Sequence, residues 1–308
     1  MLAAIAATSL LGFLSKWMYI SELASHFRLV CLYAACALLV FFVLRKSAKQ
    51  ALAAGVLVLL NAASIAPYFV KNGTTLSEDK IKTRITITQM NLFGDRNQNH
   101  AAVLKRIRES NPDLVVLSEM TQPWAVYLTK NLTEYKHVVV GVRGLALFSK
   151  LPLSNTTITC YGKLCRPAIQ TTCAKDATEV RLFVVHPLIP TGYFNDRNGQ
   201  MAQFAADART SSLPVVISGD MNCSPWSHYF SSLLKDGNLR DSQVGFGLQP
   251  SWPVLWNMVP LIPIDHCLIS DGIVVLNRRT LGNVGSDHLP VFTELGVVQP
   301  HRISYQGR

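Results

Sequence analysis

Polar side chains that can do chemistry follow an apolar run in the segment LPVVISGDMNCSPWS, residues 213–227. Asp220 and Asn222 stand two residues apart, so on an extended strand their side chains point to the same side. A carboxylate next to a carboxamide can orient an attacking water and hold a phosphate oxygen. Taken alone, the pair is also what a turn contains, because Gly-Asp and Asn-Cys-Ser-Pro are turn-forming sequences.

Other apolar runs in the chain also end or begin at acids, amides or imidazoles. The residues concerned are Asn91 after ITITQM, Glu119 after LVVLS, His186 after RLFVV, Asp265 before HCLIS, and Asp287 with His288 before LPVF. In α/β folds, strand ends that meet at one edge of a sheet are where sites are built. One such residue is usually a turn residue, but the repetition at six strand ends predicts a shared site.

In their order along the chain, Asn91, Glu119, VVHP, GDMN, IDH and GSDH resemble the endonuclease/exonuclease/phosphatase superfamily over about residues 84–296. The members of this superfamily include DNase I, abasic-site endonucleases, inositol polyphosphate 5-phosphatases and neutral sphingomyelinases. The resemblance implies a four-layer α/β-sandwich of two mixed β-sheets flanked by helices. It also implies hydrolysis of phosphate esters with Mg²⁺, or with Mn²⁺ in its place.

The resemblance assigns metal-binding roles to Asn91, Glu119 and Asp287. Glu119 is the expected principal Mg²⁺ ligand, with Asn91 nearby and Asp287 contributing directly or through water. A phosphodiester is an anion that resists attack by another anion. A divalent ion held by hard oxygen ligands lowers that barrier by neutralising the charge that develops.

Catalytic roles fall to His186, Asp220, Asn222, Asp265 and His288 by the same resemblance. Asp220 would orient or deprotonate the attacking water, and Asn222 would hold that water or a phosphate oxygen. His288, oriented by Asp265, would contact the phosphate or act as the base. His186 would act as general acid or phosphate ligand. The sequence leaves open which histidine is the acid and which is the base.

The elements that must position these residues form an alternating α/β pattern from Arg84 onward, about 225 residues in one domain. Strands are predicted at 84–91, 113–119, 136–141, 144–149, 156–161, 168–173, 179–185, 213–219, 265–270, 272–277 and 290–295. Helices are predicted at 97–110, 123–132, 196–210 and 225–235.

The first 70 residues have a different character, with apolar blocks at 1–20, 29–44 and 51–70. Crossing a bilayer takes about 20 apolar residues, and the last two blocks carry no charge. We therefore expect a transmembrane anchor of about three helices at 1–70, a tether at 71–83 and the catalytic domain at 84–308. A signal peptide is the alternative for the first block, although no basic region precedes it.

Arg45, Lys46 and Lys49 lie between the second and third blocks, which favours the cytoplasmic side for that connection. With three crossings, the protein is a multi-pass protein of the cell membrane, and its catalytic domain lies outside the cytoplasm. Lys71, with Lys80 close behind it, argues weakly for the opposite orientation. The lipid bilayer is thus an expected partner.

The net charge of +10 suits an anionic substrate, although no basic tract is dense enough to indicate a nucleic-acid stripe. We expect a membrane-anchored nuclease. The alternatives are a phospholipid phosphodiesterase of the sphingomyelinase kind, a phosphatase, and a non-catalytic binding domain. The presence of Glu119, Asp220 and His288 together argues against the binding domain. The sequence leaves the oligomeric state open.

Seven cysteines are divided between the apolar segment and the α/β domain. Cys160, Cys165 and Cys173 lie in a segment of two predicted strands joined by a Gly-containing connection. In an extracytoplasmic domain one disulfide among them is expected, for example Cys160–Cys165, and unpaired buried thiols are the alternative. The spacings lack the paired Cys-x-x-Cys ligands of a zinc site.

Overall fold

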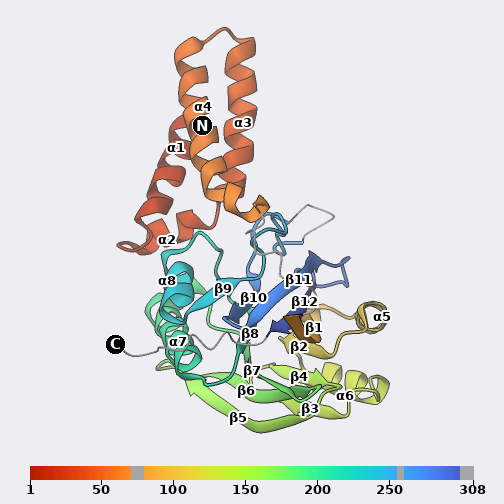
Figure 1. Cartoon of the computed structure of the whole chain (residues 1–308). Helices are drawn as coiled ribbons and strands as arrows, with labels where there is room; N and C mark the ends of the chain where they lie inside the picture. The colour runs from red at the N-terminus through yellow and green to blue at the C-terminus, as the bar shows by residue number, and fades with distance from the viewer. Residues whose placement is uncertain (71–79, 255–259, 299–308) are drawn as a thin grey trace, which may run out of the picture.

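The computed structural model describes residues 1–70, 80–254 and 260–298 (Figure 1). One six-stranded sheet has the order β11-β12-β1-β2-β4-β3, and its strands are β1 (Ile81–Asn91), β2 (Leu114–Ser118), β3 (His137–Val140), β4 (Ala146–Ser149), β11 (Ile273–Thr280) and β12 (Val291–Val298). The other has the order β5-β6-β7-β8-β10-β9, with β5 (Leu153–Tyr161), β6 (Arg166–Lys175), β7 (Thr178–Val185), β8 (Val215–Asp220), β9 (Leu239–Asp241) and β10 (Asp265–Ser270).

Helices cover the outer face of each sheet. The first sheet carries α5 (His100–Ser110) and α6 (Gln122–Asn131), and the second carries α7 (Pro190–Thr210) and α8 (His228–Asp236). One apolar core lies between the sheets and one lies under each helix pair. Strands covered on both faces read as continuous apolar runs, and all five residues of β2 are buried. The predicted sandwich of two mixed sheets flanked by helices is confirmed.

The order of predicted elements is also confirmed, except for β9, which has only three residues and which the sequence does not predict. Helix α5 begins after Asn99, whose side chain accepts the N–H of Ala102, and ends at Asn111 before Pro112. Most of the predicted tether at 71–83 lies outside the described residues, and its last residues belong to β1.

Two parallel strand pairs occupy the middle of the sandwich. In the first sheet β1 pairs in parallel with β2, and in the second β7 pairs in parallel with β8. The other strand pairs of the two sheets are antiparallel. Because parallel strands end at the same edge, the carboxyl ends of β1, β2, β7 and β8 are brought together.

The pairing of β7 with β8 depends on Gly219. Val185 is its register partner, and a Cβ atom at Gly219 would lie 1.9 Å from the Val185 carbonyl oxygen. The backbone at Gly219 also has a φ of +155°. No other residue type fits between these strands, one residue before Asp220.

The N-terminal segment consists of α1 (Leu2–Leu11), η1 (Gly12–Leu14), α2 (Tyr19–Ser25), α3 (Arg28–Leu44), α4 (Ala48–Ile65) and η2 (Ala66–Phe69). In Figure 1, α3 and α4 project from the sandwich as a hairpin, α1 packs beside them, and α2 lies next to α8. Helix α4 continued by η2 is 22 residues long and apolar enough to cross a membrane, and only 22% of its most apolar stretch is buried.

The expected three spanning helices are not what the described residues show. The first block forms α1 and η1 at Leu2–Leu14, and the chain then bends by 111° into α2 at Tyr19–Ser25, most of which lies beyond that block. Helix α3 is apolar but has only 17 residues, fewer than the about 20 that cross a bilayer. One helix therefore has the length and composition of a span, or two if the bent pair counts as one. Helix α2 turns onto the sandwich, where its Glu22 is fully buried and paired with Arg197, so it does not continue α1 as one straight span.

We expect Gly219→Ala to destabilise the protein by more than about 3 kcal/mol, because the added methyl group would force β7 and β8 apart. Thermal denaturation of the detergent-solubilised full-length chain measures the effect. Gly199→Ala in α7 is the matched control, since a Cβ there meets no atom within 4 Å, and it should leave the melting temperature unchanged or raise it. Equal melting temperatures for the two variants would show that the close approach is not required.

Candidate active site

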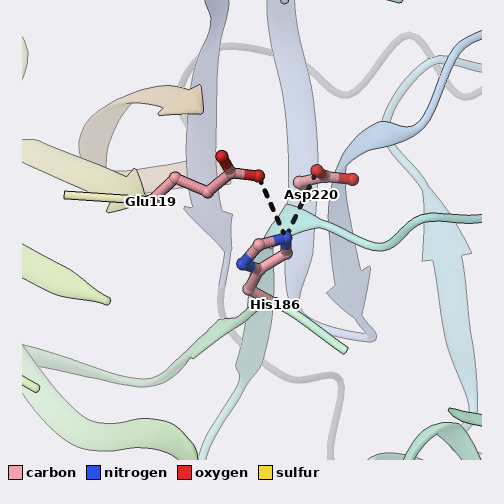
Figure 2. Close-up of side chains that lie close together, drawn as sticks. All are labelled: Glu119, His186 and Asp220. Atoms are coloured by element: carbon pink, nitrogen blue, oxygen red, sulfur yellow. Dashed lines mark ion pairs between the residues drawn. The ribbon is translucent and has the colours of Figure 1, made fainter. Parts of the chain in front are cut away.

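The polar strand ends meet at one place in the structure. The Asn91 side chain donates from Nδ2 to Glu119 Oε1 at 2.9 Å and to Asp220 Oδ2 at 3.0 Å. Figure 2 shows the side chains of Glu119, His186 and Asp220 converging from separate strands. Since Glu119 follows β2 and Asp220 ends β8, the Asn91 amide joins the acidic groups of the two sheets.

Asp220 is buried, with 1% of its surface exposed. Its Oδ1 accepts the backbone N–H of Asn222 at 2.9 Å, and its Oδ2 lies 3.5 Å from His186 Nε2 and 3.8 Å from His288 Nε2. Burial raises the pKa of the Asp220 carboxyl, but the two imidazoles and the Asn222 N–H outweigh burial and hold it well below its usual range. Asp220 is therefore a carboxylate at neutral pH.

Asp265 and His288 form a second buried pair beside Asp220. His288 Nδ1 lies 2.8 Å from Asp265 Oδ2, and Gln89 Nε2 donates to the other Asp265 oxygen at 2.7 Å. Burial lowers the pKa of His288, but the Asp265 and Asp220 carboxylates outweigh it and raise the pKa to about 10. The imidazole is therefore protonated, with its Nε2–H directed toward the Asp220 side of the site.

The turn that carries Asp287 and His288 is tied to the end of β1. Ser286 Oγ donates to the Asn91 carbonyl oxygen at 2.7 Å and accepts the His288 N–H at 3.1 Å. Asp287 Oδ2 accepts the indole N–H of Trp252 at 3.2 Å. Asp287 Oδ1 is buried and has no hydrogen-bond partner among the described residues. Burial raises the pKa of this carboxyl.

The donor set fits a hard divalent cation. One ligand atom each from Glu119, His186 and Asp220 lie within 4.8 Å of one another, and the same holds for Asp220, Asp265 and His288. The unpartnered Asp287 oxygen is a further donor, since a buried carboxylate oxygen without a partner is costly unless an ion or water satisfies it. Oxygen-rich sites of this kind fit Mg²⁺ or Mn²⁺.

Two predicted residues take positions that the sequence does not reveal. Asn91 presents its NH₂ group to the carboxylates, because its Oδ1 accepts the Phe93 N–H at 2.9 Å, so its role as a metal ligand stays a prediction. Asn222 has a left-handed backbone conformation and donates from Nδ2 to the Pro187 carbonyl oxygen at 3.1 Å. It therefore ties the end of β8 to the residue that follows His186.

Arg166 belongs to the site, although sequence reasoning missed it. Its Nη2 lies 2.9 Å from His186 Nδ1, and its Nε donates to the His186 carbonyl oxygen at 2.7 Å. A guanidinium only donates, so His186 Nδ1 accepts and the ring proton sits on Nε2, facing Asp220. The antiparallel pairing of β6 with β7 places the start of β6 beside the end of β7. Pairing these two consecutive predicted strands would have placed Arg166 near His186.

Gln89 is the other missed residue, since it holds Asp265. It lies two residues before Asn91 on the same strand, and the period of two would have placed both side chains on one face.

The comparisons with known proteins agree with this geometry. A sequence profile described as the Endonuclease/Exonuclease/phosphatase family matches residues 88–288, more than half of the chain. The chain belongs to this family. Its members are hydrolases of phosphoric esters, and the predicted resemblance is confirmed at this level. No curated protein matches the chain significantly.

Solved structures share the fold with the family domain. The crystal structure of an endonuclease/exonuclease/phosphatase family protein from Bacteroides thetaiotaomicron has a TM-score of 0.62 and 16% identity, covering 71% of this chain and 97% of that one. TDP2 from D. rerio, complexed with a single-strand DNA product, has a TM-score of 0.60 and 14% identity, covering 70% and 100%. The human Nocturnin catalytic domain with bound sulfate has a TM-score of 0.55 and 17% identity, covering 70% and 95%. Identities this low show the fold alone.

We expect Asp265→Asn to lower the pKa of His288 well below 10, because the substitution removes the carboxylate that contributes most to raising it. The protonated imidazole would then be lost at a lower pH than in the native protein. NMR titration of ¹³C-labelled histidine in the full-length chain measures the change. Asp271→Asn, at the exposed far end of the same strand, is the control and should leave the titration unchanged. An unchanged pKa of His288 in Asp265→Asn would show that Asp265 does not raise it.

Proposed function

We propose that the protein is a membrane-anchored, divalent-cation-dependent phosphodiesterase. The observation that supports this most is the position of the buried Asp220 carboxylate, in contact with Asn91 and flanked by His186 and His288. A carboxylate that lies between two imidazoles and next to the partly exposed Glu119 can orient water for attack on a phosphorus atom.

Each site residue has a role in this proposal. Asp220 accepts a hydrogen bond from the attacking water and aligns its oxygen with the phosphorus. The protonated His288 donates to a non-bridging phosphate oxygen, since its raised pKa makes it a donor at neutral pH. His186, whose Nδ1 is held by Arg166, presents its Nε2–H to the phosphate or to the leaving oxygen. One proton of the water passes to the Asp220 carboxylate as the water oxygen bonds to phosphorus. The bond between phosphorus and the leaving oxygen breaks, and the leaving oxygen takes up a proton from solvent.

Glu119 and Asp287 are the residues we propose for Mg²⁺ or Mn²⁺, with Asn91 nearby. When bound, the cation neutralises charge that develops on the phosphate oxygens. The carboxylates alone would repel the anionic substrate. A divalent cation both fits these oxygen ligands and removes that repulsion.

Nucleic acid is the first substrate class to test. The net charge of the chain and the DNA product bound to the structurally similar TDP2 support it. A phospholipid phosphodiester is the second class, and the exposed apolar surface of α3 and α4 supports it by placing the enzyme at a bilayer. Val40, Phe41 and Leu44 of α3 and Leu52, Val56 and Leu59 of α4 are each more than half exposed.

We propose a multi-pass arrangement in which α3 and α4 cross the bilayer as a hairpin. Arg45, Lys46 and Lys49 lie in or next to its turn, at the end away from the sandwich, so the positive-inside rule places the catalytic domain outside the cytoplasm. The disulfide between Cys160 and Cys165 supports this orientation, because disulfides persist in oxidising compartments. Cys173 is buried and free.

The function is tested with the purified full-length chain and bis(p-nitrophenyl) phosphate. We expect hydrolysis with Mg²⁺ or Mn²⁺ and none with EDTA. We expect Asp220→Asn and Glu119→Gln each to lower kcat by about 10³-fold or more, because they remove the water-orienting group and a metal ligand. Asp236→Asn, an exposed acid at the end of α8, is the control and should retain full activity.

Plasmid DNA, single-stranded RNA and sphingomyelin vesicles, assayed side by side, identify the substrate class. A folded protein that turns over no phosphoester in the presence of metal would favour the non-catalytic binding domain.

The membrane arrangement has its own test. The full-length protein should stay in the membrane fraction after alkaline carbonate washing, because α3 and α4 expose apolar side chains along most of their length. Protease added to intact spheroplasts should degrade the catalytic domain if it lies outside the cytoplasm, while a cytoplasmic marker enzyme stays intact. Release by carbonate would contradict the hairpin, and protection of the domain would reverse the orientation.

A further inference from the structure

Helix α2 is attached to the sandwich by a buried ion pair. Glu22 Oε1 lies 2.7 Å from Arg197 Nη2 of α7, and both side chains are fully buried. The same Glu22 oxygen accepts the Ser227 hydroxyl at 2.5 Å. Two charges removed from water are stable only when they are paired, so α2 and α7 cannot separate without a large cost.

A second contact lies just after α2. His26 Nδ1 is 2.8 Å from Ser224 Oγ and accepts the Ser224 backbone N–H at 3.2 Å. Between Ser224 and the end of β8, Cys223 has its Sγ 3.1 Å from Arg197 Nη1. Glu22, His26 and Arg197 thus hold the segment 221–227, which we call the β8 loop.

The β8 loop reaches into the active site. Asn222 donates its backbone N–H to Asp220 Oδ1 and its side-chain Nδ2 to the Pro187 carbonyl oxygen, beside His186. Only Cys223 separates Asn222 from Ser224. A displacement of Ser224 therefore moves a donor that Asp220 needs and loosens the link between the ends of β7 and β8.

The end of α4 and η2 contact the same edge of the sandwich. Trp226 Nε1 in the β8 loop donates to the Ser64 carbonyl oxygen at 3.2 Å, and the Trp226 ring contacts Tyr68 edge-on. The Tyr68 carbonyl oxygen accepts the N–H groups of Gly245 at 3.0 Å and Gly247 at 2.8 Å. The N-terminal helices are therefore fixed to the site-bearing edge at several points along the segment that precedes the tether.

We propose that Glu22 and His26 are positioning residues of the active site, which hold the β8 loop so that Asn222 keeps Asp220 and His186 in place. This inference rests on the proposed function for its catalytic consequence. It gives residues 1–70 a second role besides anchoring. The sequence-based division into an anchor and a separate catalytic domain takes no account of this contact.

The test compares substitutions in the full-length chain that differ in what they touch. His26→Leu removes the acceptor for Ser224, whereas His26→Asn keeps an acceptor near the position of Nδ1. Asn61→Leu is the matched control, because Asn61 is fully buried in α4 and, among the residues that the structure describes, hydrogen-bonds only to Ser9 and Leu57.

We expect His26→Leu to lower kcat about 10- to 100-fold on bis(p-nitrophenyl) phosphate, with KM changed less than about threefold. His26→Asn should recover most of the loss, and Asn61→Leu should keep kcat while lowering the melting temperature. Glu22→Gln should behave like His26→Leu, because it leaves Arg197 buried without its counter-charge. If the fall in kcat followed the fall in melting temperature across all four variants, a general loss of stability would explain it, and the proposal would be overturned.

Hydrogen exchange gives a readout that does not need turnover. Peptides covering the β8 loop should exchange faster in His26→Leu than in the native chain, and at the native rate in His26→Asn and Asn61→Leu. An unchanged exchange rate of the β8 loop in His26→Leu would contradict the proposal even if the enzyme is active. Faster exchange in a protein that hydrolyses no phosphoester would keep the positioning contact and reject the proposed function instead.

Discussion

A carboxylate withdrawn from water must be met by hydrogen-bond donors, and the structure around the site follows from how Asp220 meets this requirement. Asn91 supplies a donor from the first sheet, and Asn222 supplies one from the loop that follows Asp220 itself. His186 directs its Nε2–H toward the carboxylate, and the protonated His288 lies close enough to balance its charge. Because these groups come from both sheets, Asp220 has all of its hydrogen-bond partners only when the two sheets pack in one relative position.

The rest of the sandwich can be understood from that relation. Parallel pairing at the middle of each sheet brings the carboxyl ends of β1, β2, β7 and β8 to one edge. Strand β10 runs antiparallel to β8, so its first residues lie at the same edge, as does the turn before β12. Asp265 is the register partner of Asp220, so the two acids are neighbours, and His288 stands next to both. Gly219 permits the close approach of β7 that places His186 beside them.

Sequence reasoning located most of this site because strand ends are readable. Glu119, His186 and Asp220 follow apolar runs, and parallel pairing then leaves one place where they can meet. Arg166 and Gln89 were missed for a different reason: one begins a strand and the other lies within one. Whether such residues face a site depends on strand register, which a single sequence specifies only weakly.

The N-terminal segment shows the limit of hydropathy more clearly. Apolar composition predicted helices at 29–44 and 51–70, where α3 and α4 lie, but it could not distinguish a helix that projects from the domain from one that packs against it. The distinguishing residue is Glu22, which lies just beyond the first apolar block. A carboxylate at that place requires a cation when buried, and its partner Arg197 lies 175 residues further along the chain. Only the folded structure identifies that pair, and through it the apolar helices and the catalytic edge become parts of one packed unit.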